Sequence, residues 1–112
     1  MKVSRIMEVV LGKDEHAAKF RFRLRNQNET LDYLRQLEQE PDATKKIQLS
    51  TGLVTETLLE VENVFNDEGN AITVEDVKAG RIPSYFLRLL IDAFNAENSK
   101  TQGTAKNLLM SA

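Results

Sequence analysis

The segment that most constrains the fold of this chain is residues 82–95, in which most positions are apolar. Pro83 is compatible with the first turn of a helix, because the N–H that proline lacks would have no partner there. On a helix that begins near Pro83, the polar residues Arg88, Asp92 and Asn95 form one narrow stripe. A helix that is apolar on its other sides must be buried on those sides. It therefore either forms the centre of the fold or presents one face to another chain.

The composition is that of one ordinary globular domain. The chain has 112 residues, of which 41% are hydrophobic and 29% charged, and this length suffices for a single hydrophobic core. The net charge of −2 disfavours nucleic acid as an electrostatic partner. The chain contains no cysteine, which excludes disulfides and cysteine-ligated zinc.

We do not expect a signal peptide at the N-terminus. Glu8 interrupts the short apolar stretch of residues 6–11, and no small-residue cleavage site follows it. No apolar run approaches the roughly 18 residues that a membrane-spanning helix needs. We therefore expect a cytoplasmic protein.

A β-hairpin is predicted at the start of the chain. Residues 6–11 are rich in β-branched side chains, and residues 12–16 supply turn formers. Residues 19–25 alternate strictly between apolar and basic side chains, as a half-buried strand does. The apolar members are Phe20, Phe22 and Leu24, and the basic members on the opposite face are Arg21, Arg23 and Arg25.

Two helices are predicted to follow the hairpin. The first begins near Asn28, and Pro41 ends it because proline cannot continue the hydrogen-bond pattern. Asp42 is a good N-cap for the second helix, whose apolar run is expected to end at Phe65. Gly52 costs about 1 kcal/mol relative to alanine in a helix interior, so this segment forms either one helix or two shorter ones. The apolar stripes consist of Leu31, Leu34 and Leu37 in the first helix, and Ile47, Leu53, Val54, Leu58 and Val61 in the second.

A turn and a short helix separate these helices from the last one. Residues 66–70 are turn formers. Thr73 and Asp76 approximate a capping box, which opens a helix that stops near Gly80. The chain is therefore predicted to be α+β and mostly helical, with an N-terminal β-hairpin followed by about four helices.

The predicted domain organisation is one globular domain with a C-terminal tail. The domain is expected to comprise residues 1–97, with the hairpin at about residues 3–25 and the helices at about residues 28–97. Residues 98–112 are predicted to be a flexible or partner-docking tail.

The sequence contains no pattern that predicts catalysis, a metal site or a cofactor. His16 is the only histidine, and no partner for acid–base catalysis is evident beside it. The turn around Gly69 invites comparison with a calcium-binding EF-hand loop. Placing Gly69 where that loop requires glycine puts Val64 at the first ligand position, where no oxygen is available. We therefore expect a non-enzymatic protein with no catalytic, metal-binding or cofactor-binding residues.

An apolar partner-binding surface is predicted on the last helix and the C-terminal segment. Large apolar patches on a surface usually mark interfaces, and most soluble assemblies are homo-oligomers. We therefore expect protein partners and a homo-oligomer. The candidate partner-binding residues are Phe86, Leu90, Phe94, Leu108 and Leu109.

The basic strand face predicts an alternative function. Arg21, Arg23 and Arg25 could contact phosphates, as in a small nucleic-acid-binding or regulatory protein. Phe20 and Phe22 lie on the opposite face of the strand, however, whereas the stacking residues of RNA-binding sheets share a face with the basic residues. A solvated face opposite the core is the simpler interpretation.

In its layout the chain resembles the tail assembly chaperones of long, non-contractile-tailed bacteriophages and prophages. The resemblance covers roughly residues 20–107. It consists of a β-rich start, helices, the acidic turn at residues 67–70, a helical turn led by Thr73, a final amphipathic helix, and Ala105-Lys106-Asn107 near the end. Members of the family often carry tryptophan before the acidic turn, where this chain has Val64-Phe65.

The resemblance implies a non-enzymatic role in tail morphogenesis. Proteins of this family bind the tape-measure protein and the major tail protein in the bacterial host cytoplasm, and they are absent from the finished virion. The resemblance also implies a programmed ribosomal frameshift near the end of the gene, for which codons of Ala105-Lys106-Asn107 could supply the slippery run.

Overall fold

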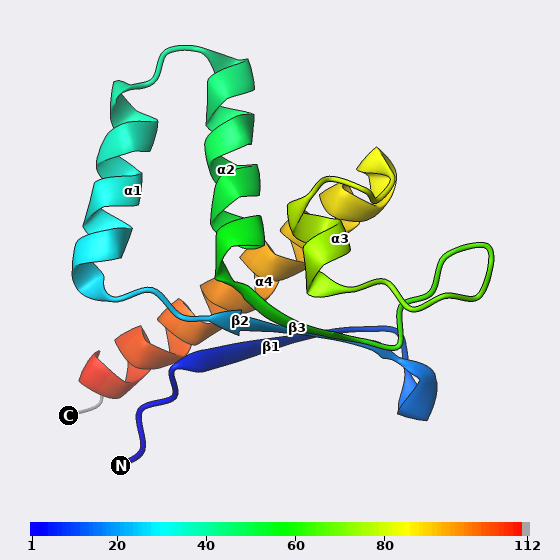
Figure 1. The fold of residues 1–112 in the computed structure, drawn as a ribbon. Coiled ribbons are helices and arrows are strands. Elements are labelled where there is room, and N and C mark those ends of the chain that lie inside the picture. The colour runs from blue at the N-terminus through cyan, green and yellow to red at the C-terminus, as the bar shows by residue number, and fades with distance from the viewer. Residues whose placement is uncertain (111–112) are drawn as a thin grey trace.

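The fold is α+β and mostly helical, as predicted. The computed structural model describes the backbone of residues 1–110 and the side chains of residues 1–100. In chain order the elements are β1 (Ile6–Leu11), the 3₁₀ turn η1 (Asp14–His16), β2 (Ala18–Arg23), α1 (Gln27–Gln39), α2 (Ala43–Thr57), β3 (Leu58–Glu62), α3 (Val74–Lys78) and α4 (Ser84–Met110). Figure 1 shows α1 and α2 standing side by side above the sheet, while α4 crosses behind it.

The predicted β-hairpin is confirmed. β1 and β2 are antiparallel, with Met7 opposite Phe22 and Val9 opposite Phe20. These four side chains lie on the inner face of the sheet and are buried, which is the consequence of the period-two alternation in both strands. Asn63, in the left-handed backbone region, donates from its side chain to the Ala17 carbonyl at 3.2 Å and so fixes the turn end of the sheet.

The prediction that the second helix ends at Phe65 is wrong, because the helix stops at Thr57. Residues 58–62 form β3 instead, and this strand completes a three-stranded sheet of order β1-β2-β3. Helical spacing fits Leu58 and Val61, but the free edge of β2 offers these residues backbone hydrogen bonds that a helix end does not. Opposite charges also face each other across the pair, since Arg21 is opposite Glu60.

The helix α2 is continuous through Gly52, so the alternative of two shorter helices does not occur. Gly52 is exposed, and a Cβ atom there would meet no heavy atom within 4 Å. The glycine therefore serves no close packing in the fold and only weakens the helix. Asp42 caps α2 as predicted, accepting a hydrogen bond from the Thr44 N–H at 2.8 Å.

The hydrophobic core lies between the inner face of the sheet and the helices α2, α3 and α4. Phe22 and Phe94 pack edge to face, with ring centroids 4.9 Å apart, and Phe20 and Phe86 lie 6.0 Å apart. Leu90 of α4 is fully buried between them. The buried cluster consists of Met7, Val9, Phe20, Phe22, Val54, Leu58, Val64, Val77, Leu90 and Phe94.

The last helix begins as predicted but is longer. The Pro83 carbonyl accepts from the N–H groups of Phe86 and Leu87, which makes Pro83 the residue that opens α4. The helix does not end near residue 97 but continues to Met110. Among the residues that the structure describes, no helix has both the length and the apolar character that crossing a bilayer requires.

Candidate functional site

The helices α1 and α2 form a hairpin, which we call the arm, and both are capped by their own sequence. The Asn26 side chain accepts from the Glu29 N–H at 2.9 Å, and the Glu29 carboxylate accepts from the Asn26 N–H at 3.2 Å. This reciprocal capping box starts α1. Pro41 separates α1 from α2, as the sequence predicts.

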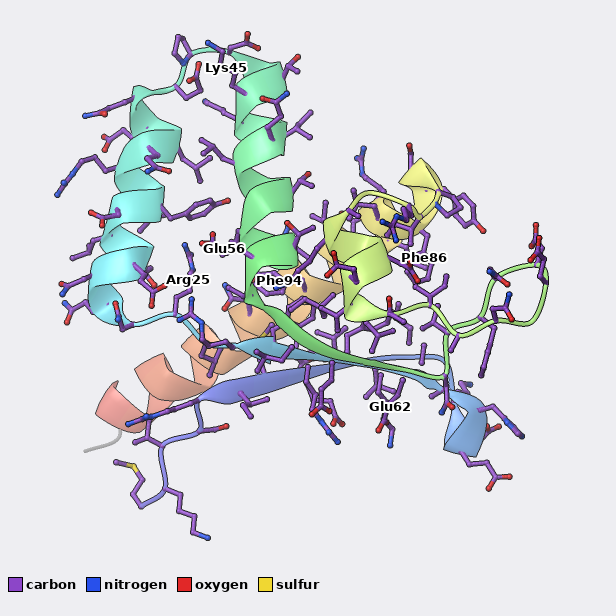
Figure 2. The ribbon with its side chains drawn as sticks, viewed as in Figure 1. Arg25, Lys45, Glu56, Glu62, Phe86 and Phe94 are labelled. Carbon is purple, nitrogen blue, oxygen red and sulfur yellow. The ribbon has the colours of Figure 1, made fainter. Side chains whose placement is uncertain are left out.

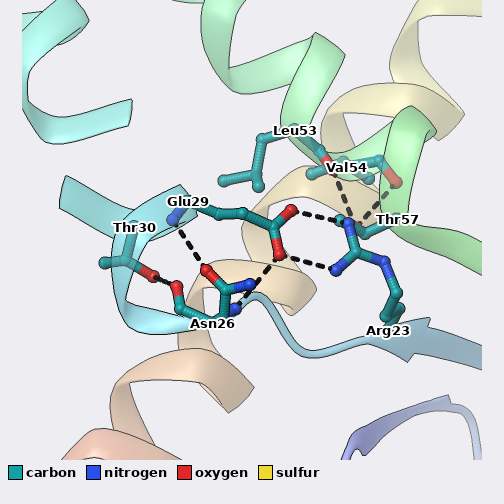
Figure 3. A network of polar contacts seen from close by, with 7 residues as sticks. All are labelled: Arg23, Asn26, Glu29, Thr30, Leu53, Val54 and Thr57. Carbon is teal, nitrogen blue, oxygen red and sulfur yellow. Dashed lines mark hydrogen bonds and ion pairs between the residues drawn. The ribbon is translucent and has the colours of Figure 1, made fainter. Parts of the chain in front are cut away.

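An ion pair fixes the base of the arm to the sheet (Figure 3). Both Nη atoms of Arg23, at the end of β2, donate to the Glu29 carboxylate at 2.9 Å. These hydrogen bonds, followed by the one from the Asn26 backbone, lower the pKa of Glu29 from its ordinary 4.5 to about 2. The same carboxylate therefore caps α1 and joins it to β2.

Polar contacts also join the arm's two helices. The Arg25 guanidinium lies over the Tyr33 ring, 4.5 Å from its centroid. The Tyr33 hydroxyl lies 3.2 Å from the Ser50 Oγ of α2, within hydrogen-bond distance. Within α2, the Thr57 hydroxyl donates to the Leu53 carbonyl at 2.8 Å (Figure 3). The arm is thus held by local polar contacts rather than by a core of its own.

The arm exposes large apolar side chains. None of the α1 residues is buried, and Leu31 and Leu34 are 49% and 53% exposed. On α2, Ile47 is 64% exposed. Ile47 also lines a pocket of about 270 Å³ between α2 and α4, together with Ile91 and Asn95. A second chain could bury these side chains without disturbing the core.

The residues predicted to bind a partner on α4 lie mainly in the chain's own core. Leu90 and Phe94 are 0% and 6% exposed, and Phe86 is half-buried against Phe20. Figure 2 shows Phe86 and Phe94 directed into the space between α4 and the sheet. One face of the last helix therefore belongs to the core, where Leu90 and Phe94 are not exposed to a partner, while Tyr85 and Leu89 on the same helix are 75% and 49% exposed. The side chains of Leu108 and Leu109 lie outside the described residues.

The three arginines of the basic strand face all contact other side chains of the protein. Arg21 donates from Nε to Glu8 at 3.2 Å and from Nη1 to Glu60, and these contacts raise its pKa, with Glu60 as the main cause. Arg23 is bound to Glu29 and Arg25 stacks on Tyr33, as described above. Their charge is therefore largely balanced within the protein.

The described residues contain no arrangement that indicates catalysis. His16 is exposed in η1, with its Nε2 atom 3.8 Å from Glu15. In the part of the chain that the structure describes, no three His, Asp or Glu side chains converge as metal ligands would. Residues 66–70 form a tight turn, in which the Asn66 side chain accepts from the N–H groups of Glu68 and Asn70.

The exposure of the arm is the feature that sequence reasoning missed. Leu31, Leu34 and Ile47 belong to the apolar stripes predicted for the first two helices, whereas the partner-binding surface was predicted on the last helix and the C-terminal segment. An apolar stripe at helical spacing reports only that one face of a helix is apolar, and not what covers it. The sequence signal for this exposure was the many polar residues that flank Leu31 and Leu34 in α1.

Comparison with known proteins gives no relative for this chain. No protein-family model matches it, and neither the curated proteins nor the solved structures contain a match.

Proposed function

We propose that this protein is a non-enzymatic assembly chaperone, whose arm covers an apolar helical segment of a partner protein. The observation that carries the proposal is the exposure of Leu31, Leu34 and Ile47 on two helices, the first of which has no buried residue. Amphipathic helices commonly bind by laying their apolar face against exposed apolar side chains of another protein. Burial of one large apolar side chain contributes about 1.5–3 kcal/mol, so these three can anchor a partner.

The resemblance to tail assembly chaperones supplies the partner class. We propose that the protein acts in the cytoplasm of a bacterial host, where it binds the tape-measure protein and the major tail protein of a phage or prophage during tail morphogenesis. A long tape-measure helix exposes apolar faces until the tail tube surrounds it. A chaperone with a preformed apolar arm would cover those faces in the meantime.

The proposal is tested by co-expression with the tape-measure protein that it expects to be encoded beside this chain's gene. We expect the chaperone to keep the tape-measure protein in solution and to co-purify with it. Replacing Leu31, Leu34 and Ile47 by serine should lower the amount of complex at least about tenfold, since a loss of 1.4 kcal/mol already has that effect.

A matched control uses an exposed leucine outside the arm. Leu59 of β3 is 47% exposed, and Leu59→Ser should leave the complex intact. If the arm variant and the Leu59→Ser control lose the same amount of complex, or if neither loses any, the arm is not part of the interface. The gene neighbourhood gives a separate check: without a major tail protein gene upstream and a very long helical reading frame downstream, the tail-assembly assignment fails.

The alternative, nucleic-acid binding through the arginines of β2, has weaker support. Arg21 lies between Glu8 and Glu60, and Arg23 is bound bidentately to Glu29, so little charge is free for phosphates. Nucleic-acid binding that weakens steeply with salt and is lost in Arg21→Glu would favour this alternative over the chaperone.

A further inference from the structure

A basic pocket lies at the end of the sheet where β2 leads into α1. Its volume is about 500 Å³, and its lining includes Val3, Arg5, Leu24 and Arg25. Arg23 also lines it, but its guanidinium group already donates hydrogen bonds to the Glu29 carboxylate. Among the ion pairs of the described residues, none involves Arg5 or Arg25. The pocket therefore presents the Arg5 guanidinium, which has no ion pair among the described residues, and the Arg25 guanidinium, which stacks on Tyr33. Glu29 also lines the pocket and is bound to Arg23, so the pocket keeps an excess of positive charge beside an apolar wall.

The opposite end of the sheet carries the complementary charge. Residues 66–70 project from the body as a short loop, which we call the acidic finger (Figure 1). Its tip carries Asp67 and Glu68, both exposed and without an ion pair among the described residues. At its base Phe65 is 60% exposed. The finger thus combines two free carboxylates with one aromatic side chain.

The finger cannot reach the pocket of its own chain. Asn63, just before the finger, bonds to Ala17 at the start of β2, whereas Arg23 at the pocket ends that strand. The 6 residues of β2 separate the two ends of the sheet by about 20 Å at the usual rise of a strand. Any contact between a finger and a pocket must therefore involve two molecules.

We propose that the acidic finger of one copy docks in the basic pocket of a second copy, so that the protein associates head to tail. Asp67 and Glu68 would lie against Arg5 and Arg25, so that negative carboxylates face positive guanidinium groups. Phe65 would pack against Val3, which is 80% exposed in the single chain. Because the two surfaces differ, the contact is heterologous and generates a ring or an open chain of copies.

The finger is already in a fixed conformation before it docks. The Asn66 N–H donates to the Asn70 carbonyl at 2.9 Å, and the Gly69 N–H donates to the Asn66 carbonyl at 3.0 Å. Gly69 occupies the positive-φ position that this turn requires. The entropic cost of ordering the loop backbone on docking is therefore small. The interface uses no apolar residue of the arm, so it holds or fails independently of the proposed function.

Sedimentation velocity on the full chain tests the proposal through two variants that each lose one surface. The finger variant is Asp67→Ser with Glu68→Ser, and the pocket variant is Arg5→Glu. We expect the wild type to exceed the 12.7 kDa of one chain with rising concentration, up to about 1 mM, and to dissociate in about 1 M salt. Each variant alone should sediment as a monomer, with association weakened at least about tenfold.

Mixing the two variants gives the decisive measurement. The finger variant keeps an intact pocket and the pocket variant keeps an intact finger, so an equal mixture should form a 1:1 pair that grows no further. As a control, Asp32→Asn with Glu38→Gln removes two charges from α1 and should leave the wild-type association unchanged. A monomeric wild type or a mixture that does not pair would overturn the proposal. So would a finger variant that still associates like the wild type while the pocket variant does not.

Discussion

The body and the arm of this molecule are stabilised by different interactions. In the body, formed by the sheet with α3 and α4, the side chains of Phe20, Phe22 and Leu90 are completely buried. In the arm, α1 buries no residue, and its contacts are a capping box, an ion pair and a stacked arginine. Apolar burial dominates folding free energy, whereas exposed polar contacts contribute little each.

This difference assigns the two regions different tasks. The body sets the global stability of the fold, because its core must be disrupted for the chain to unfold. Within the arm, α1 can open or fray at a lower cost, as regions with few buried apolar contacts do, whereas α2 is anchored in the core by Val54. A surface that binds a partner's helix is expected in the region of lower stability, since the partner supplies the burial that the arm lacks.

The largest effect is expected when a charge enters the body's core. Leu90→Asp removes a fully buried side chain and places a carboxylate where no partner exists, at a cost above about 5 kcal/mol. This cost is comparable with the entire stability of a small domain, so the variant should lack a cooperative thermal transition by circular dichroism. Its neighbour Leu89 is 49% exposed, and Leu89→Asp should unfold cooperatively near the wild-type temperature. If Leu90→Asp folded like the wild type, the conclusion that α4 forms part of the core would be wrong.

A truncation in each region measures the contrast directly. Phe22→Ala should lower the free energy of unfolding by about 3–5 kcal/mol, because it leaves a cavity beside Phe94. Leu34→Ala in the arm should lower it by less than about 1 kcal/mol, since that side chain is already half exposed. Urea denaturation of both variants checks the difference. Similar losses would mean that the arm and the body form one cooperative unit.

The sequence predicted the elements whose signals are local. The alternation of residues 19–25 gave the hairpin, and Thr73 with Asp76 gave the capping box that starts α3. Pro83 gave the start of α4 to within one residue. In each case the residues that determine the structure also make the contacts, so no information from distant segments is needed.

The sequence failed where a distant segment decides the structure. Leu58 and Val61 continue the apolar spacing of α2, but β2 needs a partner on its second edge, and that edge lies far away in the chain. The period-two pattern of residues 60–62 was too short to outweigh the helical pattern. For the candidate site, Leu31, Leu34 and Ile47 were predicted as members of apolar helical stripes, but their exposure depends on how the helices pack against the rest of the fold.

A smaller effect is expected at the N-cap of the arm. Asn26→Ala removes the side chain that accepts from the Glu29 N–H and should destabilise α1 by about 1 kcal/mol. Amide hydrogen exchange in α1 should then be about fivefold faster, while exchange in β1 and β2 stays unchanged. Asn28→Ala, two positions further on in α1, serves as the control. If exchange rises equally in the sheet, the arm does not open independently of the body.

The smallest expected effect is a pH dependence confined to the arm, and it arises from Glu29. The Arg23 hydrogen bonds lower the pKa of Glu29 from 4.5 to about 2, so the folded state holds this carboxylate ionised where an unfolded chain would protonate it. The stabilisation is therefore complete above about pH 4.5 and is lost as the pH falls from there to about 2. Over this range we expect the exchange protection of α1 to decrease relative to that of the sheet in the wild type, but not in Glu29→Gln.

An NMR titration of the carboxyl groups separates this cause from general acid unfolding. In Arg23→Gln the pKa of Glu29 should rise towards 4.5, because its largest stabilising contact is gone. Asp76 provides an internal control, since Thr73 is the main cause that lowers its pKa and lies in the body. If Arg23→Gln left the pKa of Glu29 near 2, the capping hydrogen bond from Asn26 would account for the shift. The arm would then be fixed by its own helix cap rather than by its ion pair to the sheet, and the body and the arm would be coupled only through the chain connections and the contacts of α2.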